Sequence, residues 1–358
     1  MKKILYVDLF SQYGHTNLNR VYIDRFNEIG YKVEFVLRKD YINELKIPFE
    51  DVRLALPERY FDCRAGKIKD RFLQWKMLRL IINKIDLDQY NIIFFSFFEE
   101  MSICMSGIKG NLIFLNHSNV TGLENVLKLF FLKRVAKIGK ILVFHESIKN
   151  RFSEFGINNV LVEPLGLAKP YDLEMDRQDE VLRSLDHRLI SPFYRVKILV
   201  PTGSKYNDLL IKNAINDPLF LSFIIANKVL IIIKDITLSS DCENICLLES
   251  YLSNIQYQIL FRSSDCIIIN YPETFRYKVS ATLFECFANK KPCFLIDIDS
   301  FRLFQEYFNY EPYYNDIPSL ISLIKTFIEE IDEISMQPYI NIESLNPQFD
   351  SVVNLFGK

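Results

Sequence analysis

Long hydrophobic runs are absent from this chain of 358 residues. A membrane-spanning helix needs about 18–20 consecutive apolar residues, and no apolar run approaches that length. The chain begins MKKILYVDLF, which has the charge of a signal peptide, but Asp8 interrupts its short apolar run. We therefore interpret this start as a first strand and expect a cytoplasmic protein that is neither secreted nor integral in a membrane.

Paired cysteines are also lacking. The seven cysteines are scattered without a CxxC pair, and several lie inside apolar runs, which predicts reduced, buried thiols. Cys242 and Cys246 are the only pair to test for zinc, and no second Cys/His pair lies nearby. Asp-x-Asp pairs occur at 86–88 and 297–299, but the first falls in a predicted helix-to-strand turn and the second ends a predicted strand. We expect no metal and no cofactor.

Glycine-rich phosphate loops are missing as well. The first strand is followed by DLFSQYGHTNLNR (8–20), which has no GxGxxG and offers only Gly14 for a close backbone approach. A dinucleotide fingerprint is therefore not expected there. His15 in this loop can line the acceptor side of a ligand site; alternatively, the loop is simply capped by Asn17 or Asn19.

Buried-looking strands alternate with helices along most of the chain. The length suits two domains, and 49% apolar residues are ample for their cores. The predicted strands are 4–8, 33–37, 92–98, 112–116, 141–144, 160–164, 196–201, 229–234, 244–248, 266–270 and 292–297. The predicted helices include 18–29, 68–84, 122–138, 146–155 and an acidic amphipathic one at 318–334. Such alternation indicates parallel sheets with helices on both faces.

The predicted fold class is therefore α/β, with two Rossmann-like doubly wound parallel-sheet domains facing a central cleft. Residues 1–168 form the N-terminal, acceptor-side domain, and 169–195 form a linker. Residues 196–337 form the C-terminal, nucleotide-sugar-binding domain, and 338–358 form a tail that can return to the first domain. Ligands in such sheets bind outside the carboxyl ends of the strands, so the loops there are the candidate sites.

Three of these loops carry candidate binding groups. His117 follows a strand and can hydrogen-bond a ligand hydroxyl or transfer a proton; it can also be a satisfied structural group. His145 precedes what reads as a capped helix. Gly203, Ser204 and Lys205 follow a strand in the second half and can bind a diphosphate through backbone N–H groups and the Lys charge. The alternative is an ordinary turn.

The stretch 271–297, YPETFRYKVSATLFECFANKKPCFLID, is the most informative. It places a charged loop before an apolar helix, whose N-terminus offers free N–H groups to an anion. The N–H donors belong to Ser280, Ala281 and Thr282, and Arg276 and Lys278 add positive charge. Glu285, one turn further along, can accept two hydrogen bonds from a vicinal diol such as a ribose. Alternatively, Thr282 and Glu285 form a capping box with a purely structural role.

The segment 263–297, SSDCIIINYPETFRYKVSATLFECFANKKPCFLID, resembles the GT-B glycosyltransferases of the retaining family 4, also called group 1. The shared pattern is an acidic pair, an apolar strand, a loop, a helix bearing Glu, then Lys-Pro and another strand. FHESIKNRFSEFGINNVLVEPLGL (144–167) similarly resembles the segment that leads to the interdomain linker.

The resemblance assigns roles to individual residues. The family motif has two Glu separated by seven residues, the first contacting the donor sugar and the second the ribose. Glu285 matches the second position, Tyr277 stands at the first, and Glu273 lies near it. His117 matches the first-domain His that contacts the donor sugar, and Lys205 is the best match to the basic pair that binds the diphosphate.

The resemblance implies a metal-independent, retaining glycosyltransferase. It would move a sugar from a UDP- or GDP-linked donor to a glycan or lipid-linked acceptor in bacterial surface polysaccharide synthesis. Two alternatives stay open. One is a nucleotide-sugar epimerase or hydrolase on the same fold. The other is a degenerate GT-B protein that binds a nucleotide or partner without catalysis, which Tyr277 in place of an acid would fit.

Positive charge is concentrated in the first half. Residues 1–170 carry 26 Lys and Arg against 19 Asp and Glu, whereas 171–358 carry 17 against 26. The segments 64–84 and 127–140 are basic and amphipathic, which suits peripheral contact with an anionic membrane on the inner face of the plasma membrane. The alternative is that their apolar stripes pack on the sheet and the bases are solvated. No nucleic-acid motif is visible, so nucleic acid is not an expected partner.

Overall fold

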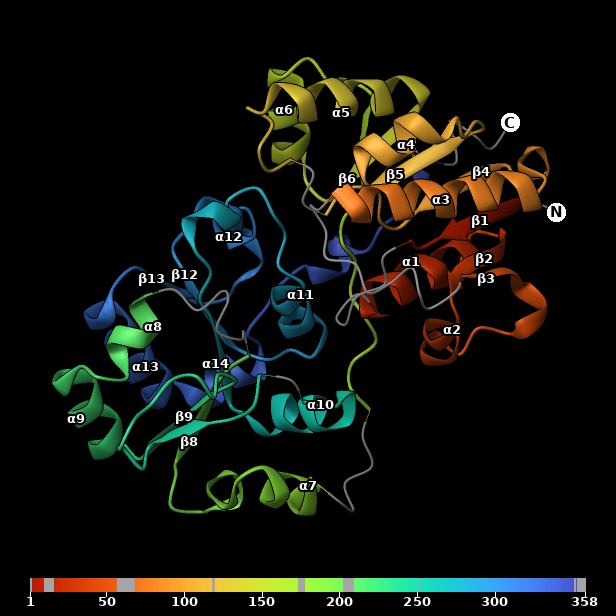
Figure 1. Ribbon diagram of the computed structural model, residues 1–358. Coiled ribbons are helices and arrows are strands. Elements are labelled where there is room, and N and C mark those ends of the chain that lie inside the picture. Colours follow the sequence, from red (N-terminus) through yellow and green to blue (C-terminus); the bar gives the residue numbers. More distant parts are fainter. Residues whose placement is uncertain are drawn as a thin grey trace. The chain divides into compact units, whose positions relative to one another are not determined.

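The computed structural model describes residues 2–9, 16–56, 68–117, 120–172, 178–201, 209–250, 252–350 and 352. The chain divides into two compact units (Figure 1). The first consists of Met1–Ala168 with Leu345–Lys358, and the second of Lys169–Ser344. Within the described ranges, no helix is both long enough and apolar enough to cross a membrane.

The first unit is built on a parallel sheet in which the order of the seven described strands is β3-β2-β1-β4-β5-β6-β7. The strands are β1 (Lys3–Val7), β2 (Lys32–Arg38), β3 (Val52–Leu56), β4 (Ile92–Phe95), β5 (Leu112–Leu115), β6 (Gly139–Val143) and β7 (Val160–Val162). The helices are α1 (Thr16–Glu28), α2 (Lys39–Leu45), α3 (Ile68–Lys84), α4 (Glu100–Ser106), α5 (Val126–Ile138) and α6 (Glu146–Glu154).

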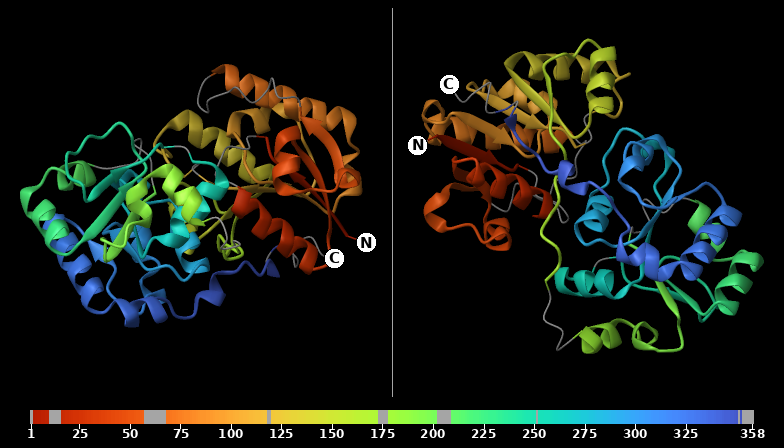
Figure 2. Two further views of the ribbon diagram at one scale, coloured as in Figure 1. Left: turned by 90° about the horizontal axis from the view of Figure 1, so that it is seen from below. Right: turned by 180° about the vertical axis from the view of Figure 1, so that it is seen from behind.

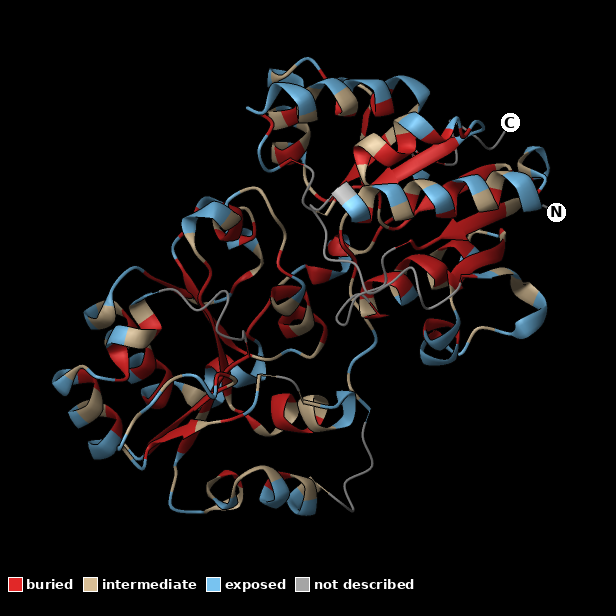
Figure 3. Cartoon of the chain, viewed as in Figure 1, coloured by how far each residue is buried: buried red, intermediate tan, exposed pale blue. Residues whose placement is uncertain are grey.

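Both faces of this sheet are covered, which is why its central strands are continuously apolar. Figure 3 shows these strands as buried along their length. Neighbouring rings of β4 point to opposite faces: Phe94 packs against Tyr22 and Phe26 of α1, whereas Phe95 stacks on Phe114 of β5. The crossovers from β1 to β2 and from β3 to β4 run in opposite directions, so right-handed connections place α1 and α3 on opposite faces.

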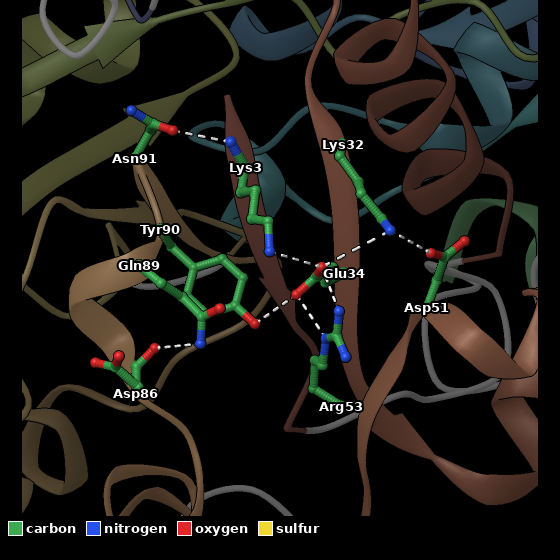
Figure 4. A network of polar contacts seen from close by, with 9 residues as sticks. All are labelled: Lys3, Lys32, Glu34, Asp51, Arg53, Asp86, Gln89, Tyr90 and Asn91. Atoms are coloured by element: carbon green, nitrogen blue, oxygen red, sulfur yellow. Dashed lines mark hydrogen bonds and ion pairs between the residues drawn. The ribbon is translucent and has the colours of Figure 1, made fainter. Parts of the chain in front are cut away.

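A buried ionic cluster ties together the amino-terminal ends of these strands (Figure 4). Glu34 on β2 is fully buried and accepts hydrogen bonds from Arg53 Nε of β3 at 2.6 Å and from the Tyr90 hydroxyl at 2.7 Å. Lys3 Nζ on β1 lies 3.3 Å from the same carboxylate. These contacts lower the pKa of Glu34 from 4.5 to about 2, with the Arg53 hydrogen bonds as the largest cause. Because the cluster lies at the edge opposite the ligand-binding ends of the strands, its role is structural.

The chain from Leu345 on belongs to the first unit, and its described residues 345–350 pack beside α1 (Figure 2, left). Phe349 is fully buried, with its ring stacked on Phe26 at 4.5 Å and edge-on to Tyr22 at 5.2 Å. Glu163 Oε2 accepts hydrogen bonds from the backbone N–H groups of Gln348 at 3.1 Å and Phe349 at 3.0 Å. The segment is therefore fixed by both apolar packing and backbone hydrogen bonds.

The second unit has a parallel sheet with the described order β10-β9-β8-β11-β12-β13. Its strands are β8 (Val196–Val200), β9 (Val229–Ile233), β10 (Ile245–Leu247), β11 (Cys266–Ile269), β12 (Cys293–Ile296) and β13 (Tyr313–Tyr314). Its helices are α7 (Gln178–Leu185), α8 (Leu209–Ala214), α9 (Pro218–Ala226), α10 (Asn254–Ser263), α11 (Ala281–Ala288), α12 (Asp299–Arg302), α13 (Ile317–Glu329) and α14 (Ile331–Met336). The stretch 178–195, inside the predicted linker, carries α7 and contacts this unit through Arg188, which donates to the Ile245 carbonyl at 2.9 Å.

The predicted α/β class with two doubly wound parallel sheets is confirmed. The single helix predicted at 318–334 is wrong, because the chain breaks at Glu330 into α13 and α14. A continuous helix would carry Asp332 and Glu333 at its C-terminus, where the helix dipole disfavours negative charge. In α14 they occupy the first turn, where it favours them.

Candidate functional site

The carboxyl ends of β9 and β11 in the second unit carry buried polar side chains. Asp235, two residues after β9, is fully buried and accepts two hydrogen bonds from Thr237 through Oδ1. Asn270 directly follows β11, is also fully buried, and accepts a hydrogen bond from the Tyr314 hydroxyl. Asp235 Oδ2 and Asn270 Nδ2 have no hydrogen-bond partner within the described residues. Buried polar atoms usually have a hydrogen-bond partner within the protein or in an ordered water. The two atoms without one mark this edge of the sheet as a place where a ligand could supply the missing hydrogen bonds.

Lys234, Tyr257 and Glu285 form a cluster at the same edge. The Tyr257 hydroxyl of α10 donates to Glu285 Oε2 of α11 at 2.9 Å. Lys234, the residue after β9, has its Nζ 4.7 Å from the centre of the Tyr257 ring. One strand end and two helices thus bring a cation, a phenol and a carboxylate together.

Burial perturbs two of these groups. Desolvation lowers the pKa of the Lys234 ammonium, and the Glu285 charge opposes that shift only in part. Burial, followed by the Glu285 charge, raises the pKa of Tyr257 well above its ordinary value. The phenol therefore stays protonated and acts as a donor to the carboxylate. An additional negative charge beside Lys234 would favour the protonated form of its amine.

The N-terminus of α11 is capped by Ser280, whose Oγ accepts a hydrogen bond from the Leu283 N–H at 3.1 Å. The alternative capping box of Thr282 and Glu285 is therefore wrong, because the helix begins earlier and Glu285 lies in its second turn. Within the described ranges, no acceptor contacts the backbone N–H of Ala281 or Thr282. Two N–H groups at the positive end of the helix dipole are thus available to an anion.

The loop before α11 is folded on aromatic rings. Glu273–Phe275 form a short 3-10 turn in which Glu273 is exposed. The Phe275 ring stacks on Tyr271 at 4.2 Å, and Lys278 Nζ lies 5.6 Å from the centre of the Phe275 ring. Arg276 is exposed and its guanidinium lies 4.9 Å from the centre of the Tyr277 ring. The loop therefore carries its two bases on rings next to the start of α11.

Of the three histidines considered from the sequence, the structure describes His117 and His145, both in the first unit. His117 is half-buried, and its Nε2 donates to the Ser96 carbonyl at 2.7 Å, so that nitrogen is held by the end of β4. His145 caps α6, with Nδ1 accepting from the Ser147 N–H at 3.1 Å, as expected for a capped helix. A ligand role for His117 stays a prediction.

Several predicted site residues lie outside the described residues. They are Gly14 and His15 on the acceptor side and Gly203, Ser204 and Lys205 for the diphosphate. Their roles stay predictions.

The Asp-x-Asp pairs make local contacts. Asp86 accepts a hydrogen bond from the Asp88 N–H, and Asp297 forms an ion pair with Arg302 at 2.7 Å. Within the described ranges, no cluster of three or more His, Cys, Asp or Glu is arranged to hold a metal ion. The cysteines in those ranges are free, and four of them are buried.

Sequence reasoning missed Lys234 and Tyr257. A signal for Lys234 was present, since a base directly after a buried strand falls at the ligand-binding end of the sheet. Tyr257 had no such signal, because its contact with Glu285 joins two helices and depends on how they pack.

No family model matches the sequence, and no match is found among curated proteins. Solved structures are similar in fold. The structure of Anabaena HepE in complex with UDP-glucose has 13% sequence identity and a TM-score of 0.64, covering 99% of this chain and 100% of that one. A glycosyltransferase from Rickettsia africae has 14% identity and a TM-score of 0.63, covering 99% and 94%.

A UDP-GlcNAc 2-epimerase from Neisseria meningitidis bound to UDP-GlcNAc has 10% identity and a TM-score of 0.56, covering 99% and 98%. At these identities the similarity concerns the fold. It extends over nearly the whole length of each chain and includes both parallel sheets. The chain therefore has the GT-B fold.

Proposed function

We propose that the chain is a glycosyltransferase that moves a sugar from a UDP- or GDP-linked donor to a glycan or lipid-linked acceptor. The observation that carries the proposal is the convergence of Lys234, Tyr257, Glu285 and the free N–H groups of α11 at one edge of the second sheet. The arrangement pairs donors for a diphosphate with an acceptor for sugar hydroxyls. The likeness to HepE in complex with UDP-glucose supports the same choice of donor.

In this proposal the Glu285 carboxylate accepts hydrogen bonds from the ribose hydroxyls, and the Tyr257 hydroxyl fixes its orientation. The N–H groups of Ala281 and Thr282 bind the diphosphate, together with Lys234 and the bases Arg276 and Lys278. Glycosyl transfer places negative charge on the departing diphosphate, and donors that are already fixed in position stabilise this charge without a metal ion. The retaining course and the role in bacterial surface polysaccharide synthesis, with peripheral attachment to the plasma membrane, belong to the same proposal.

A thermal-shift and calorimetric comparison of UDP, 2′-deoxy-UDP and GDP tests the site. We expect the wild-type protein to bind UDP or GDP, and UDP better than its 2′-deoxy form. Glu285→Gln should weaken binding by about tenfold to a hundredfold, since hydrogen bonds to a charged group contribute about 1.5–3 kcal/mol. The variant should also lose the preference for the 2′-hydroxyl.

The matched control is Glu329→Gln, which removes an exposed carboxylate of α13 in the same unit and should bind like the wild type. No response to any nucleotide would refute the enzyme proposal. Nucleotide binding without turnover, against both glycan and lipid-linked acceptors, would favour the catalytically degenerate GT-B protein with Tyr277 in place of an acid.

The likeness to the Neisseria meningitidis epimerase favours a second candidate, a nucleotide-sugar epimerase or hydrolase. Incubation with UDP-sugars and no acceptor, followed by NMR, separates the two. The second candidate is supported if, without an acceptor, the donor is epimerised or hydrolysed at least as fast as the protein transfers its sugar when an acceptor is present. A donor that stays unchanged until an acceptor is added supports transfer, with His117, Glu273 and Tyr277 as the proposed groups around the donor sugar.

A further inference from the structure

Three helices lie side by side on one face of the first sheet: α3, α4 and α5 (Figure 1). The Trp75 indole N–H of α3 donates to the Met105 carbonyl of α4 at 3.1 Å, and the Cys104 thiol of α4 contacts the Phe131 carbonyl of α5 at 3.3 Å. The three helices therefore present one continuous outer surface.

Large apolar side chains are exposed on this surface. They are Phe72, Met105, Val126, Leu127 and Phe130, each at least 49% exposed. The Phe72 ring stacks on Trp75 at 5.3 Å, which adds an indole to the group. Single exposed apolar residues are ordinary, but a group gathered on adjacent helices marks an interaction surface.

The same surface is strongly basic. Five Lys or Arg belong to α3 and four to α5. The acidic residues of these helices add little negative charge to the surface. Asp70 is buried, Glu99 forms an ion pair with Arg71 at 2.9 Å, and Glu100 forms one with Lys128 at 3.6 Å. Seven bases make no ion pair with any carboxylate that the structure describes: Lys69, Lys76, Arg79, Lys84, Lys133, Arg134 and Lys137. We call these bases and the five exposed apolar side chains the basic face.

Cations and rings are also interleaved. Lys76 Nζ lies 4.7 Å from the centre of the Phe72 ring, and the Arg134 guanidinium lies 5.4 Å from that of Phe130. A ring that can enter the boundary between headgroups and acyl chains, beside a cation that can contact a phosphate, suits a lipid interface. Exposed rings of this kind would gain nothing from a purely polar partner, whereas a bilayer uses both the rings and the charges.

We propose that the basic face binds the surface of an anionic lipid bilayer. The apolar members of the basic face on these two helices, Phe72 on α3 and Val126, Leu127 and Phe130 on α5, lie in the first two turns of each helix. Those turns are nearest the carboxyl ends of the strands, where ligands bind in such sheets. A protein attached by this face would hold the ligand-binding edge of its first sheet close to the bilayer. The proposal does not depend on catalysis.

Flotation with unilamellar vesicles tests it on the full-length protein. We expect binding to vesicles of phosphatidylcholine with phosphatidylglycerol, weak binding to phosphatidylcholine alone, and weakening as salt rises. Each base near an anionic surface contributes about fivefold in affinity, so Lys133→Gln/Arg134→Gln/Lys137→Gln should bind about a hundredfold more weakly. Phe130→Ser should weaken binding without changing its dependence on salt.

The matched control is Arg20→Gln/Lys39→Gln/Lys46→Gln, which removes three exposed bases from α1, α2 and the end of α2, away from the basic face. It should bind like the wild type. Thermal melts that match the wild type show that each variant is folded, as expected for exposed positions. Equal losses in the two triple variants, or no binding to anionic vesicles, would overturn the proposal. Tight binding to a short RNA without binding to vesicles would also overturn it and indicate a nucleic-acid surface.

Discussion

The buried carboxylate of Glu34 should make the stability of the first unit depend on pH in the acid range. The pKa of Glu34 is about 2 in the folded protein, against 4.5 for an unperturbed Glu as in the unfolded chain. At 1.36 kcal/mol per pKa unit, the ionised carboxylate contributes about 3 kcal/mol to the free energy of unfolding at neutral pH. Because the folded-state pKa is the lower one, this stabilisation is complete above about pH 4.5. It is lost as the pH falls through about 2.

Glu34→Gln removes the charge while keeping the shape of the side chain. Its amide would place N–H groups against the Arg53 guanidinium, so we expect the free energy of unfolding to fall by about 3 kcal/mol at neutral pH. Trp75 is the single tryptophan of the chain and lies on α3, so its fluorescence reports on unfolding of the first unit.

Urea unfolding followed by this fluorescence, from neutral pH down to about pH 2, measures the difference between wild type and variant. The difference should shrink as the pH falls, because protonation of Glu34 makes the two proteins alike. Glu50→Gln, at an exposed position of the same unit, is the control and should differ little from the wild type at any pH. A wild-type-to-Glu34→Gln difference that stays constant across the range would refute the assignment to the Glu34 charge.

Three further changes have defined outcomes. Tyr257→Phe removes the hydrogen bond to Glu285 and should weaken nucleotide binding by about tenfold with kcat little changed, as calorimetry and kinetics would measure; unchanged affinity would contradict a positioning role. Lys234→Met should weaken UDP binding much more than uridine binding, since the ammonium faces the proposed diphosphate, and equal losses in a titration would contradict that. Phe349→Ala should lower the free energy of unfolding of the first unit by about 3–5 kcal/mol, followed by Trp75 fluorescence in urea; a loss below about 1 kcal/mol would contradict the packing.

The βα alternation could be predicted because strands buried on both faces are continuously apolar, as in Val229–Ile233. Two of the four edge strands, at 160–162 and 245–247, were predicted, whereas the other two were not. Val52–Leu56 is only partly buried and alternates apolar with exposed positions, and Tyr313–Tyr314 is too short to leave a pattern. The short helix Glu100–Ser106 was not predicted, because seven residues are too few to show the 3.6-residue spacing of apolar positions that identifies an amphipathic helix.

At the candidate site, Glu285 could be selected from its place on a helix after a buried strand. Its partners could not be, because Tyr257 and Lys234 lie far from it in sequence and reach it only through packing. The alternative capping box, with Thr282 as the cap, placed the start of the helix too late. Both Ser280 and Thr282 are good caps, and only the backbone shows that Ser280 takes that position.

Because residues 345–358 belong to the first unit, the chain cannot be cut into its two units at a single point. In the order of the chain, the second unit (169–344) is an uninterrupted insertion within the first unit. Residues 1–168 alone lack Phe349, whose ring stacks on Phe26. A fragment that ends at 168 would leave Glu163 without its two backbone donors and the Phe26 ring uncovered. During synthesis, the first unit can be completed only after the whole second unit has left the ribosome. Residues 345–350, which are made after the whole second unit, are thus needed to complete the unit that was begun first.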